Sequence, residues 1–265
     1  MSSSVKFRGV SFAYSKGHQV LKDLTFQVRA GQVLAVVGQN GSGKSTIAGL
    51  IAGLIKLPKN SGELNIVGRS AIVFQNPDVQ VLFDNVEDDI KFVLDNYKVE
   101  KSEHARRITD ALSLVKMLEF QHSNPLKFSL GQKQRIAIAS ILALDPEVII
   151  FDEATSSLDS AGKRDVLEIV EALKDKGKTV IMVTNVVDEL RIADSVLLLQ
   201  NGAGTQFDGP SAGAAGVRLT IDALNAAGFA LSDFFKLKDY ALKGNETARG
   251  ALELLEQEPT LGKVG

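Results

Sequence analysis

A glycine-rich segment between an apolar run and a helical segment constrains this chain more than any other feature. The apolar run covers residues 33–37, and the segment after it reads Gly38-Gln39-Asn40-Gly41-Ser42-Gly43-Lys44-Ser45-Thr46. Glycines let the backbone curl so that successive N–H groups point inward at an anion, and a helix N-terminus adds free N–H groups and partial positive charge. The pattern G-x-x-x-x-G-K-[ST] in a strand–turn–helix context therefore predicts a phosphate-binding loop.

Two side chains of this loop carry specific chemistry. Lys44 is placed to reach the β- and γ-phosphates of a nucleotide, and the hydroxyl of Ser45 is placed to bind Mg²⁺. The remaining residues expected to cradle the phosphates are Gly38, Asn40, Gly41, Ser42, Gly43 and Thr46. A chance glycine-rich turn is the alternative, and the fit of the whole pattern and of both flanks disfavours it.

Composition bounds the classes of protein that remain. The 265 residues suffice for one large domain with a small appendage. With 30 Lys plus Arg against 32 Asp plus Glu, the net charge of −2 gives no bulk electrostatic reason to expect nucleic acid. The chain has no cysteine, so disulfides and thiolate metal sites are excluded. No apolar run approaches the roughly 20 residues that span a bilayer, so we expect any membrane association to come through a partner.

Strand patterns surround the predicted loop. Residues 5–12 and 24–28 alternate apolar and polar side chains, which predicts an antiparallel layer before the loop. Tyr14 lies between these strands, where it could stack on an adenine ring or be a half-buried residue at a strand end. Short strands are predicted at residues 63–67 and 70–74, and later strands at 148–151, 179–184 and, as the last of the core, 195–199.

Polar side chains follow several of these strands. Gln75 follows the strand at 70–74, Asp152 and Glu153 follow the buried strand at 148–151, and Asn185 follows the strand at 179–184. In an α/β domain the ligand binds at the carboxyl edge of the sheet. Asp152 is therefore expected in the Mg²⁺ shell, Glu153 to polarise the attacking water, and Gln75 to touch Mg²⁺ or that water.

Helical patterns occupy the middle of the chain. Residues 84–89 carry an acidic cluster on a predicted helix at 86–94, and a second amphipathic helix is predicted at 103–119. An acidic helix face is often simply solvated, and that interpretation stays open here. Ser129 is expected to cap a third helix, whose N-terminus offers a second place to hold an anion.

Taken together, these motifs resemble the ATP-binding cassette family over about residues 4–210. The residues that carry the resemblance are Tyr14 as the adenine-stacking aromatic, Gly38 to Ser45 as Walker A, Gln75 as the Q-loop, Phe128 to Gln132 as the signature, Asp152 and Glu153 as Walker B, and Asp159 as the D-loop aspartate. The resemblance implies an α/β P-loop NTPase cassette that sandwiches ATP and Mg²⁺ between one chain's Walker A and the signature of another. It thereby implies nucleotide contacts for Ser129, Gly131, Gln132 and Asp159.

Within that family, residues 74–80 and 151–156 look like the energy-coupling-factor vitamin importers and their cobalt and nickel relatives. The tail is similar to the short C-terminal helical extension of those ATPases. The implied domains are a nucleotide-binding domain at 1–210, with a helical subdomain near 76–145, and an extension at 211–265 that we expect to dimerise. The implied partners are a paralogous ATPase, a transmembrane coupling subunit and substrate-binding membrane subunits, with the chain peripheral to the cytoplasmic face of the membrane.

Two positions depart from the family pattern. Leu130 replaces a signature glycine, where a side chain should hinder approach of the partner's γ-phosphate. Asn185 replaces the switch histidine, and its amide is shorter and never protonated, so it can touch the γ-phosphate without positioning water as imidazole does. These departures predict reduced activity in a homodimer and favour pairing with a paralogue. A largely regulatory subunit and a non-transport ATPase remain as alternative functions.

Overall fold

The computed structural model describes residues 3–15, 17–231 and 233–243, so residues 244–265 of the predicted extension lie outside the described part. The strands are β1 (Ser3–Ser15), β2 (His18–Arg29), β3 (Val33–Gly38), β4 (Glu63–Ile66), β5 (Ser70–Val73), β6 (Val148–Asp152), β7 (Thr179–Val183), β8 (Ser195–Gln200) and β9 (Ala203–Asp208). The α-helices are α1 (Lys44–Ile51), α2 (Val86–Asn96), α3 (Lys101–Leu114), α4 (Leu130–Leu142), α5 (Ser160–Asp175), α6 (Ala214–Ala226) and α7 (Asp233–Leu242). Short 3₁₀ turns are η1 (Pro77–Val79), η2 (Leu118–Phe120), η3 (Pro125–Lys127), η4 (Val187–Ile192) and η5 (Pro210–Ala212).

The central sheet sets the position of the loops that follow its strands. Its strand order is β5-β6-β7-β3-β8-β9, and every neighbouring pair is parallel except β8 with β9. The register places Val183 beside both Val36 and Asp152, so β3, β6 and β7 end at the same edge. Parallel strands deliver their following loops to one side of a sheet. The phosphate-binding loop, Asp152 and Asn185 therefore meet at one edge.

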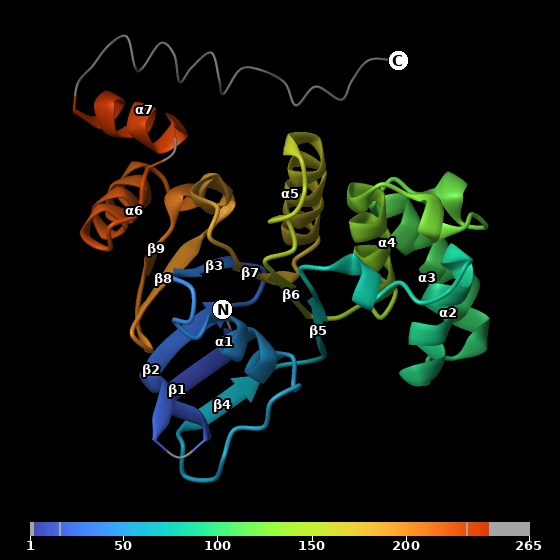
Figure 1. Ribbon diagram of the computed structural model, residues 1–265, viewed down its shortest axis with the longest axis horizontal. Coiled ribbons are helices and arrows are strands. Elements are labelled where there is room, and N and C mark those ends of the chain that lie inside the picture. The colour runs from blue at the N-terminus through green and yellow to red at the C-terminus, as the bar shows by residue number, and fades with distance from the viewer. Residues whose placement is uncertain (1–2, 16, 232, 244–265) are drawn as a thin grey trace.

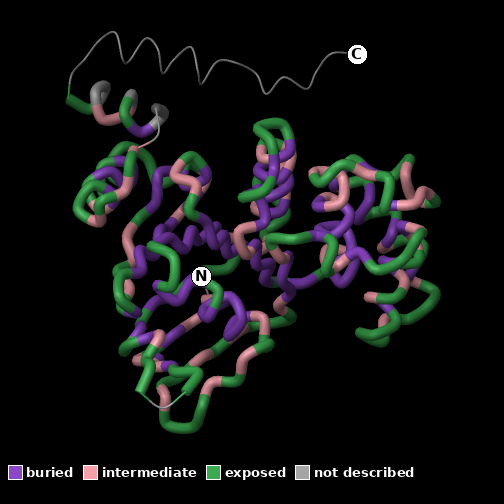
Figure 2. Tube along the Cα trace, viewed as in Figure 1, coloured by how far each residue is buried: buried purple, intermediate pink, exposed green. Residues whose placement is uncertain are grey.

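Alternation along the central strands divides the core into two layers. On β6, Val148 and Ile150 pack with β1, β2 and α1, whereas Ile149 and Phe151 pack with α4 and α5. On β7, Ile181 and Val183 face the first layer and Val180 and Met182 face the second. Side chains point to alternate faces of a strand, so continuous apolar runs mark strands buried on both faces. Figure 2 shows this sheet as the most buried part of the chain.

The predicted antiparallel layer is confirmed. Besides the two expected strands it contains a third, β4. Its order is β2-β1-β4, and both pairs are antiparallel. Phe7 of β1 and Phe26 of β2 stack with ring centroids 4.4 Å apart and are buried in the layer that contains α1. Figure 1 shows this sheet below the central one, with α1 between them.

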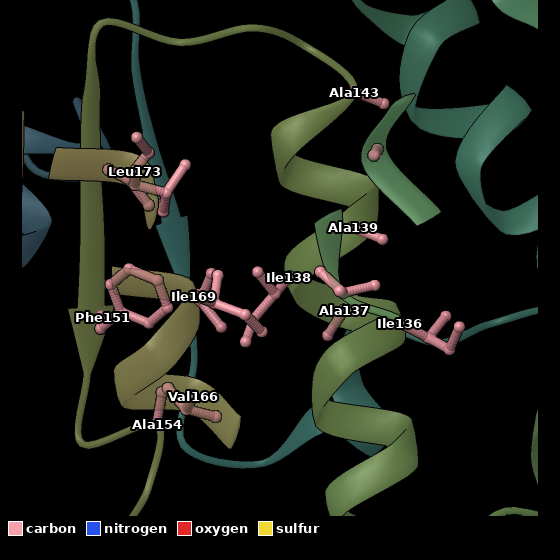
Figure 3. Close-up of a cluster of buried hydrophobic side chains, with 14 of the residues drawn as sticks. Ile136, Ala137, Ile138, Ala139, Ala143, Phe151, Ala154, Val166, Ile169 and Leu173 are labelled. Carbon is pink, nitrogen blue, oxygen red and sulfur yellow. The ribbon is translucent and has the colours of Figure 1, made fainter. Parts of the chain in front are cut away.

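Helices α2, α3 and α4 gather beyond the β5 edge of the central sheet (Figure 1). They contact one another, and α4 also packs against α5, where Ile138 faces Ile169 (Figure 3). The predicted helix at 103–119 is too long, because α3 ends at Leu114. Lys116 adopts a left-handed conformation with φ 55°, and Met117 N–H then donates to Leu112 O at 2.8 Å, which closes the helix.

The prediction that the strand at 195–199 is the last of the core is wrong. β9 follows it through Asn201 and Gly202, both at positive φ (51° and 84°), and pairs with β8 as an antiparallel edge strand. Helix α6 then packs against β9 at this end of the sheet, and its residues Val217, Ile221 and Leu224 share one buried cluster with Ala35 and Val37 of β3. Among the described residues, no helix is long and apolar enough to span a membrane.

Candidate phosphate-binding site

The loop between β3 and α1 depends on glycines at the two places where the chain is tightest. Gly43, the residue before α1, has φ 108°, a conformation that side chains rarely adopt. A Cβ on Gly38 would lie 2.5 Å from Leu199 O and 2.6 Å from Ser42 Oγ. Ser42 Oγ is itself buried with no hydrogen-bond partner in the structure. A buried polar atom in this turn therefore remains available to a ligand.

Lys44 lies inside the loop. Its side chain is 5% exposed, and its Nζ donates to the carbonyls of Gly38 (2.9 Å) and Gln39 (3.2 Å). Burial lowers the pKa of Lys44, while the carboxylates of Glu153 and Asp152 oppose that shift. The distance from Lys44 Nζ to Glu153 Oε1 is 3.8 Å, so the Lys44 ammonium and the Glu153 carboxylate lie in one cluster.

Ser45 and Asp152 join the loop to the end of β6. Ser45 Oγ donates to Asp152 Oδ1 at 3.2 Å. Burial raises the pKa of Asp152, and the bond from Ser45 partly opposes it. A hydroxyl beside a carboxylate is an all-oxygen donor pair, which suits Mg²⁺, because that ion usually takes one or two protein oxygens and completes its shell with phosphates and water. These two residues fit the metal that the sequence implies. The described residues contain no group of three or more His, Cys, Asp or Glu side chains that could hold a metal alone.

Glu153 and Asn185 face each other at this edge. Asn185 Nδ2 donates to Glu153 Oε1 at 3.2 Å and to Asn40 Oδ1 at 3.1 Å. The amide therefore bridges the phosphate-binding loop and the glutamate. Glu153 has φ 51°, a left-handed backbone conformation that is costly for a residue with a side chain and that is concentrated at functional sites.

Gln75 reaches the same region through a serine that the sequence analysis did not single out. Gln75 Nε2 donates to Ser156 Oγ at 2.9 Å, and Ser156 Oγ donates to Glu153 O at 2.9 Å. The loop after β5 is thus connected to the backbone of Glu153. In the sequence Ser156 stands only at the end of the segment 151–156 that carries the narrower resemblance, with no role of its own assigned.

Tyr14 lies beside the loop on the antiparallel layer. Its hydroxyl is 3.2 Å from Thr46 Oγ1, and Phe12 packs edge-on against its ring with centroids 5.0 Å apart. Tyr14 stands one residue before the end of β1 and is 65% exposed, so it is less buried than the strand-end interpretation expects. The exposed ring face leaves adenine stacking as a prediction that this geometry permits.

The residues around α4 do not join this cluster within one chain. Figure 1 shows α4 beyond the β5 edge, whereas α1 lies beneath β6 and β7. Ser129 caps α4 through a reciprocal pair, in which Ser129 Oγ accepts from Gln132 N–H (3.3 Å) and Gln132 Oε1 accepts from Ser129 N–H (3.0 Å). Gly131 lies near Gly162, and Asp159 Oδ1 accepts from Gly162 N–H at 2.8 Å as the cap of α5. Leu130 is 37% exposed at the first position of α4.

Two cavities differ in their relation to this cluster. One of about 160 Å³ lies on the phosphate-binding loop and is lined by Gln39 to Ser42, by the β8–β9 turn, and by Ala227 and Phe229 after α6. Another of about 540 Å³ lies at the opposite edge, near the start of β6, where α3, α4 and α5 end. There Arg107 donates to Ala143 O (3.1 Å) and Lys178 pairs with Asp145 (2.6 Å). The larger cavity shares no lining residue with the phosphate-binding cluster and is therefore separate from it.

Comparison with known proteins adds four findings. The sequence profile of a family described as "ABC transporter" matches residues 21–156. The "Energy-coupling factor transporter ATP-binding protein EcfA1" of Ligilactobacillus salivarius (strain UCC118) is 42% identical, over 75% of this chain and 75% of that protein. Among solved structures, cbiO1 from Clostridium perfringens, part of the ABC transporter complex cbiONQ, has a TM-score of 0.76 at 24% identity, over 95% of this chain and 100% of that one. The ATP-binding cassette MJ0796, bound to ADP and Pi in a dimeric post-hydrolysis state, has a TM-score of 0.67 at 25% identity, over 77% and 98%.

Proposed function

Because this chain belongs to the ABC transporter family as one of its ATP-binding cassettes, we propose that it hydrolyses Mg·ATP to drive an energy-coupling-factor importer. The predicted α/β P-loop cassette is confirmed by the solved relatives. The observation that carries the proposal is the cluster at the carboxyl edge of the sheet. There Asp152, Glu153 and Asn185 lie beside the phosphate-binding loop and its Lys44.

Each residue of the cluster has one task in the proposed reaction. The loop N–H groups and Lys44 bind the β- and γ-phosphates and offset charge that develops on the transferred phosphoryl group. Ser45 and Asp152 would hold Mg²⁺, which would supply positive charge to offset that of the phosphate oxygens. Glu153 orients the attacking water as its hydrogen-bond acceptor. Asn185 donates to Glu153, and Gln75 lies on the chain of bonds that ends at the Glu153 carbonyl.

A second subunit completes the proposed site. Ser129, Gly131 and Gln132 lie apart from the chain's own loop, so they are available to contact nucleotide bound by another chain, with Asp159 next to them at the start of α5. In a homodimer both sites would carry Leu130 and Asn185. In a heterodimer with a paralogue that has the usual glycine and histidine, each site carries only one departure. We therefore favour the heterodimer.

The proposed membrane partners are a transmembrane coupling subunit and substrate-binding subunits that import vitamins or transition-metal ions. The chain would then be peripheral, at the cytoplasmic face of the membrane. The sequence suggests the acidic cluster at 84–89 as part of the docking groove. Asp84 and Asp88 are exposed there, beside the exposed apolar side chains of Leu82 and Phe83. Asp89 is buried and cannot contact a partner.

The departures at Leu130 and Asn185 support one other function, a largely regulatory nucleotide-binding subunit that binds Mg·ATP with little turnover. Separate measurements of ATP binding and of ATP hydrolysis distinguish the two functions. Lys44→Ala should weaken ATP binding roughly ten- to hundredfold, because a charge-assisted hydrogen bond is worth about 1.5–3 kcal/mol. Lys59→Ala, at an exposed turn after α1, is the matched control and should bind as the parent does. Titration calorimetry with equal affinities for both variants would refute the loop assignment.

Hydrolysis is tested with Glu153→Gln. The amide keeps the shape of the side chain and loses the carboxylate acceptor, so turnover should fall by about 10²–10⁴ with ATP still bound. The measurement is phosphate release by the chain alone and after co-purification with its paralogue and membrane subunits. Binding without turnover in every assembly would establish the regulatory function instead.

A further inference from the structure

A buried carboxylate lies behind both segments that carry the proposed hydrolytic groups. Glu189 of η4 is 3% exposed, and its Oε1 accepts a hydrogen bond from the hydroxyl of Thr155. Burial raises the pKa of Glu189, and the hydroxyl groups of Thr155 and Thr184 both oppose that shift, so the Thr184 side chain also lies against the carboxylate. Thr155 and Thr184 are themselves 3% and 2% exposed. A buried carboxylate is tolerated where such partners satisfy it, so the three side chains depend on one another.

Each of the two threonines lies close in sequence to one of the proposed hydrolytic residues, which connects Glu189 to the phosphate-binding site. Thr155 lies two residues after Glu153, and Thr184 directly precedes Asn185. Glu153 N–H also donates to Val183 O at 2.9 Å, so the two segments already lie side by side. The left-handed backbone of Glu153 is strained, and such a conformation persists only where its surroundings hold it. Glu189 is the polar group that contacts the segment on each side.

We infer that Glu189 is a positioning residue that fixes Glu153 and Asn185 relative to each other through Thr155 and Thr184. It does not touch the nucleotide, and it acts by keeping the Asn185–Glu153 contact at its 3.2 Å distance. This inference rests on the proposed hydrolysis of ATP, in which those two side chains handle the water and the γ-phosphate.

Three variants of the full-length chain isolate this effect. Glu189→Gln keeps the shape, and its amide can accept from Thr155 and donate to the hydroxyl oxygen of Thr184. Glu189→Ala removes the hydrogen bond to Thr155 and the carboxylate that lies against Thr184. Leu190→Ala is the matched control, because Leu190 is the next residue of η4 and is fully buried in the cluster that contains β3 and α6. It loosens the same turn without removing a bond to either threonine.

Glu189→Ala should lower kcat by about tenfold with the dissociation constant for ATP within about twofold of the parent, because a small misplacement of reacting groups costs rate more than binding. Glu189→Gln should retain parental kcat. Adding Thr155→Val to Glu189→Ala should slow the enzyme no further, because both changes remove the same contact. Leu190→Ala should retain kcat per folded molecule.

Amide hydrogen exchange gives a readout that does not depend on turnover. Glu189→Ala should accelerate exchange in residues 153–158, which lie more than 30 positions away in sequence, whereas Leu190→Ala should not. If Glu189→Ala leaves exchange in 153–158 at the parental rate, or if it behaves as Leu190→Ala does, the inference is wrong. A parent chain that binds ATP without hydrolysing it would count against the proposed function, and the exchange result would still decide this inference.

Discussion

At the residue scale, neighbouring acids of one helix have different environments. Asp88 is exposed on α2, whereas Asp89 is 3% exposed and its Oδ1 accepts from the backbone N–H groups of Leu82 (2.7 Å) and Phe83 (3.0 Å). Burial raises the pKa of Asp89, and those two bonds oppose the shift. Asp89 therefore holds the loop before α2 in place, and Asp88 is the residue that a partner can reach.

Charge reversal should separate these two residues. Asp89→Lys places an unpaired cation in the interior and strands two backbone donors, each worth about 1–3 kcal/mol when left unsatisfied, so it should destabilise the fold severely. Asp88→Lys places a cation in the first turn of α2 and removes an exposed pair with Lys91, so it should lower the free energy of unfolding by only about 1 kcal/mol. Urea denaturation of the two variants checks this.

The same pair tests the docking proposal. If Asp88 faces a basic residue of the coupling subunit, Asp88→Lys should reduce co-purification with the membrane subunits while ATP affinity stays parental. Undiminished co-purification of this stable variant would favour a merely solvated acidic face. Asp89→Lys is unsuitable for that experiment, because its loss of assembly would follow from unfolding.

At the element scale, capping of α4 and the proposed nucleotide contact would use the same atoms. The reciprocal bonds between Ser129 and Gln132 satisfy two otherwise free donors at the start of α4. Ser129→Ala should therefore lower the free energy of unfolding by about 1 kcal/mol, whereas Ser129→Asp retains a good cap and should cost little.

The proposed contact with a nucleotide bound by the partner predicts the opposite ranking of these two variants for ATP-dependent dimerisation. Ser129→Asp places a carboxylate where the proposed dimer brings the γ-phosphate, so ATP-dependent dimerisation should be weaker in Ser129→Asp than in Ser129→Ala. Denaturation and sedimentation velocity with and without ATP measure the two quantities. Dimerisation that follows stability in both variants would contradict a nucleotide contact at Ser129.

The elements that the sequence predicts well are those with strong local patterns. Apolar strands, the glycine loop and the Ser129 cap follow from periodicity and from capping chemistry. The end of α3 was missed because a lysine, Lys116, takes the left-handed position where glycine is the usual signal. β9 was missed although Asn201-Gly202 is a recognised hairpin signal that could have revealed it. The burial of Asp89 and the contacts of Glu189 depend on tertiary packing, which no local pattern reports.

At the scale of the whole molecule, the two departures at Leu130 and Asn185 lie on different surfaces. Asn185 contacts the chain's own Glu153, and Leu130 lies at the start of α4, beyond the β5 edge. In a sandwich dimer they would therefore affect different sites. Asn185 would act on the chain's own nucleotide, and Leu130 on the partner's.

Restoring each residue should accordingly act on different sites. Asn185→His should raise turnover chiefly at this chain's own Walker A site, and Leu130→Gly chiefly at the partner's. The isolated chain should be slow, and co-expression with a paralogue that has the usual residues should raise the rate. Steady-state ATPase assays, with Glu153→Gln used to silence this chain's site, distinguish the two contributions. A homodimer as fast as the pair would rule out the heterodimer preference.

The packing of β3 has a consequence for how the molecule communicates. Leu34 and Val36 share a cluster with the antiparallel layer and α1, while Ala35 and Val37 share one with η4, β8 and α6, so different parts of the chain cover the two faces of the strand. Beyond Gly38 the loop meets Ala227 and Phe229 across the small cavity. The phosphate-binding loop thus follows a strand that is packed on both faces. We therefore expect a displacement of the C-terminal cluster, or of the layer that carries Tyr14, to shift this loop.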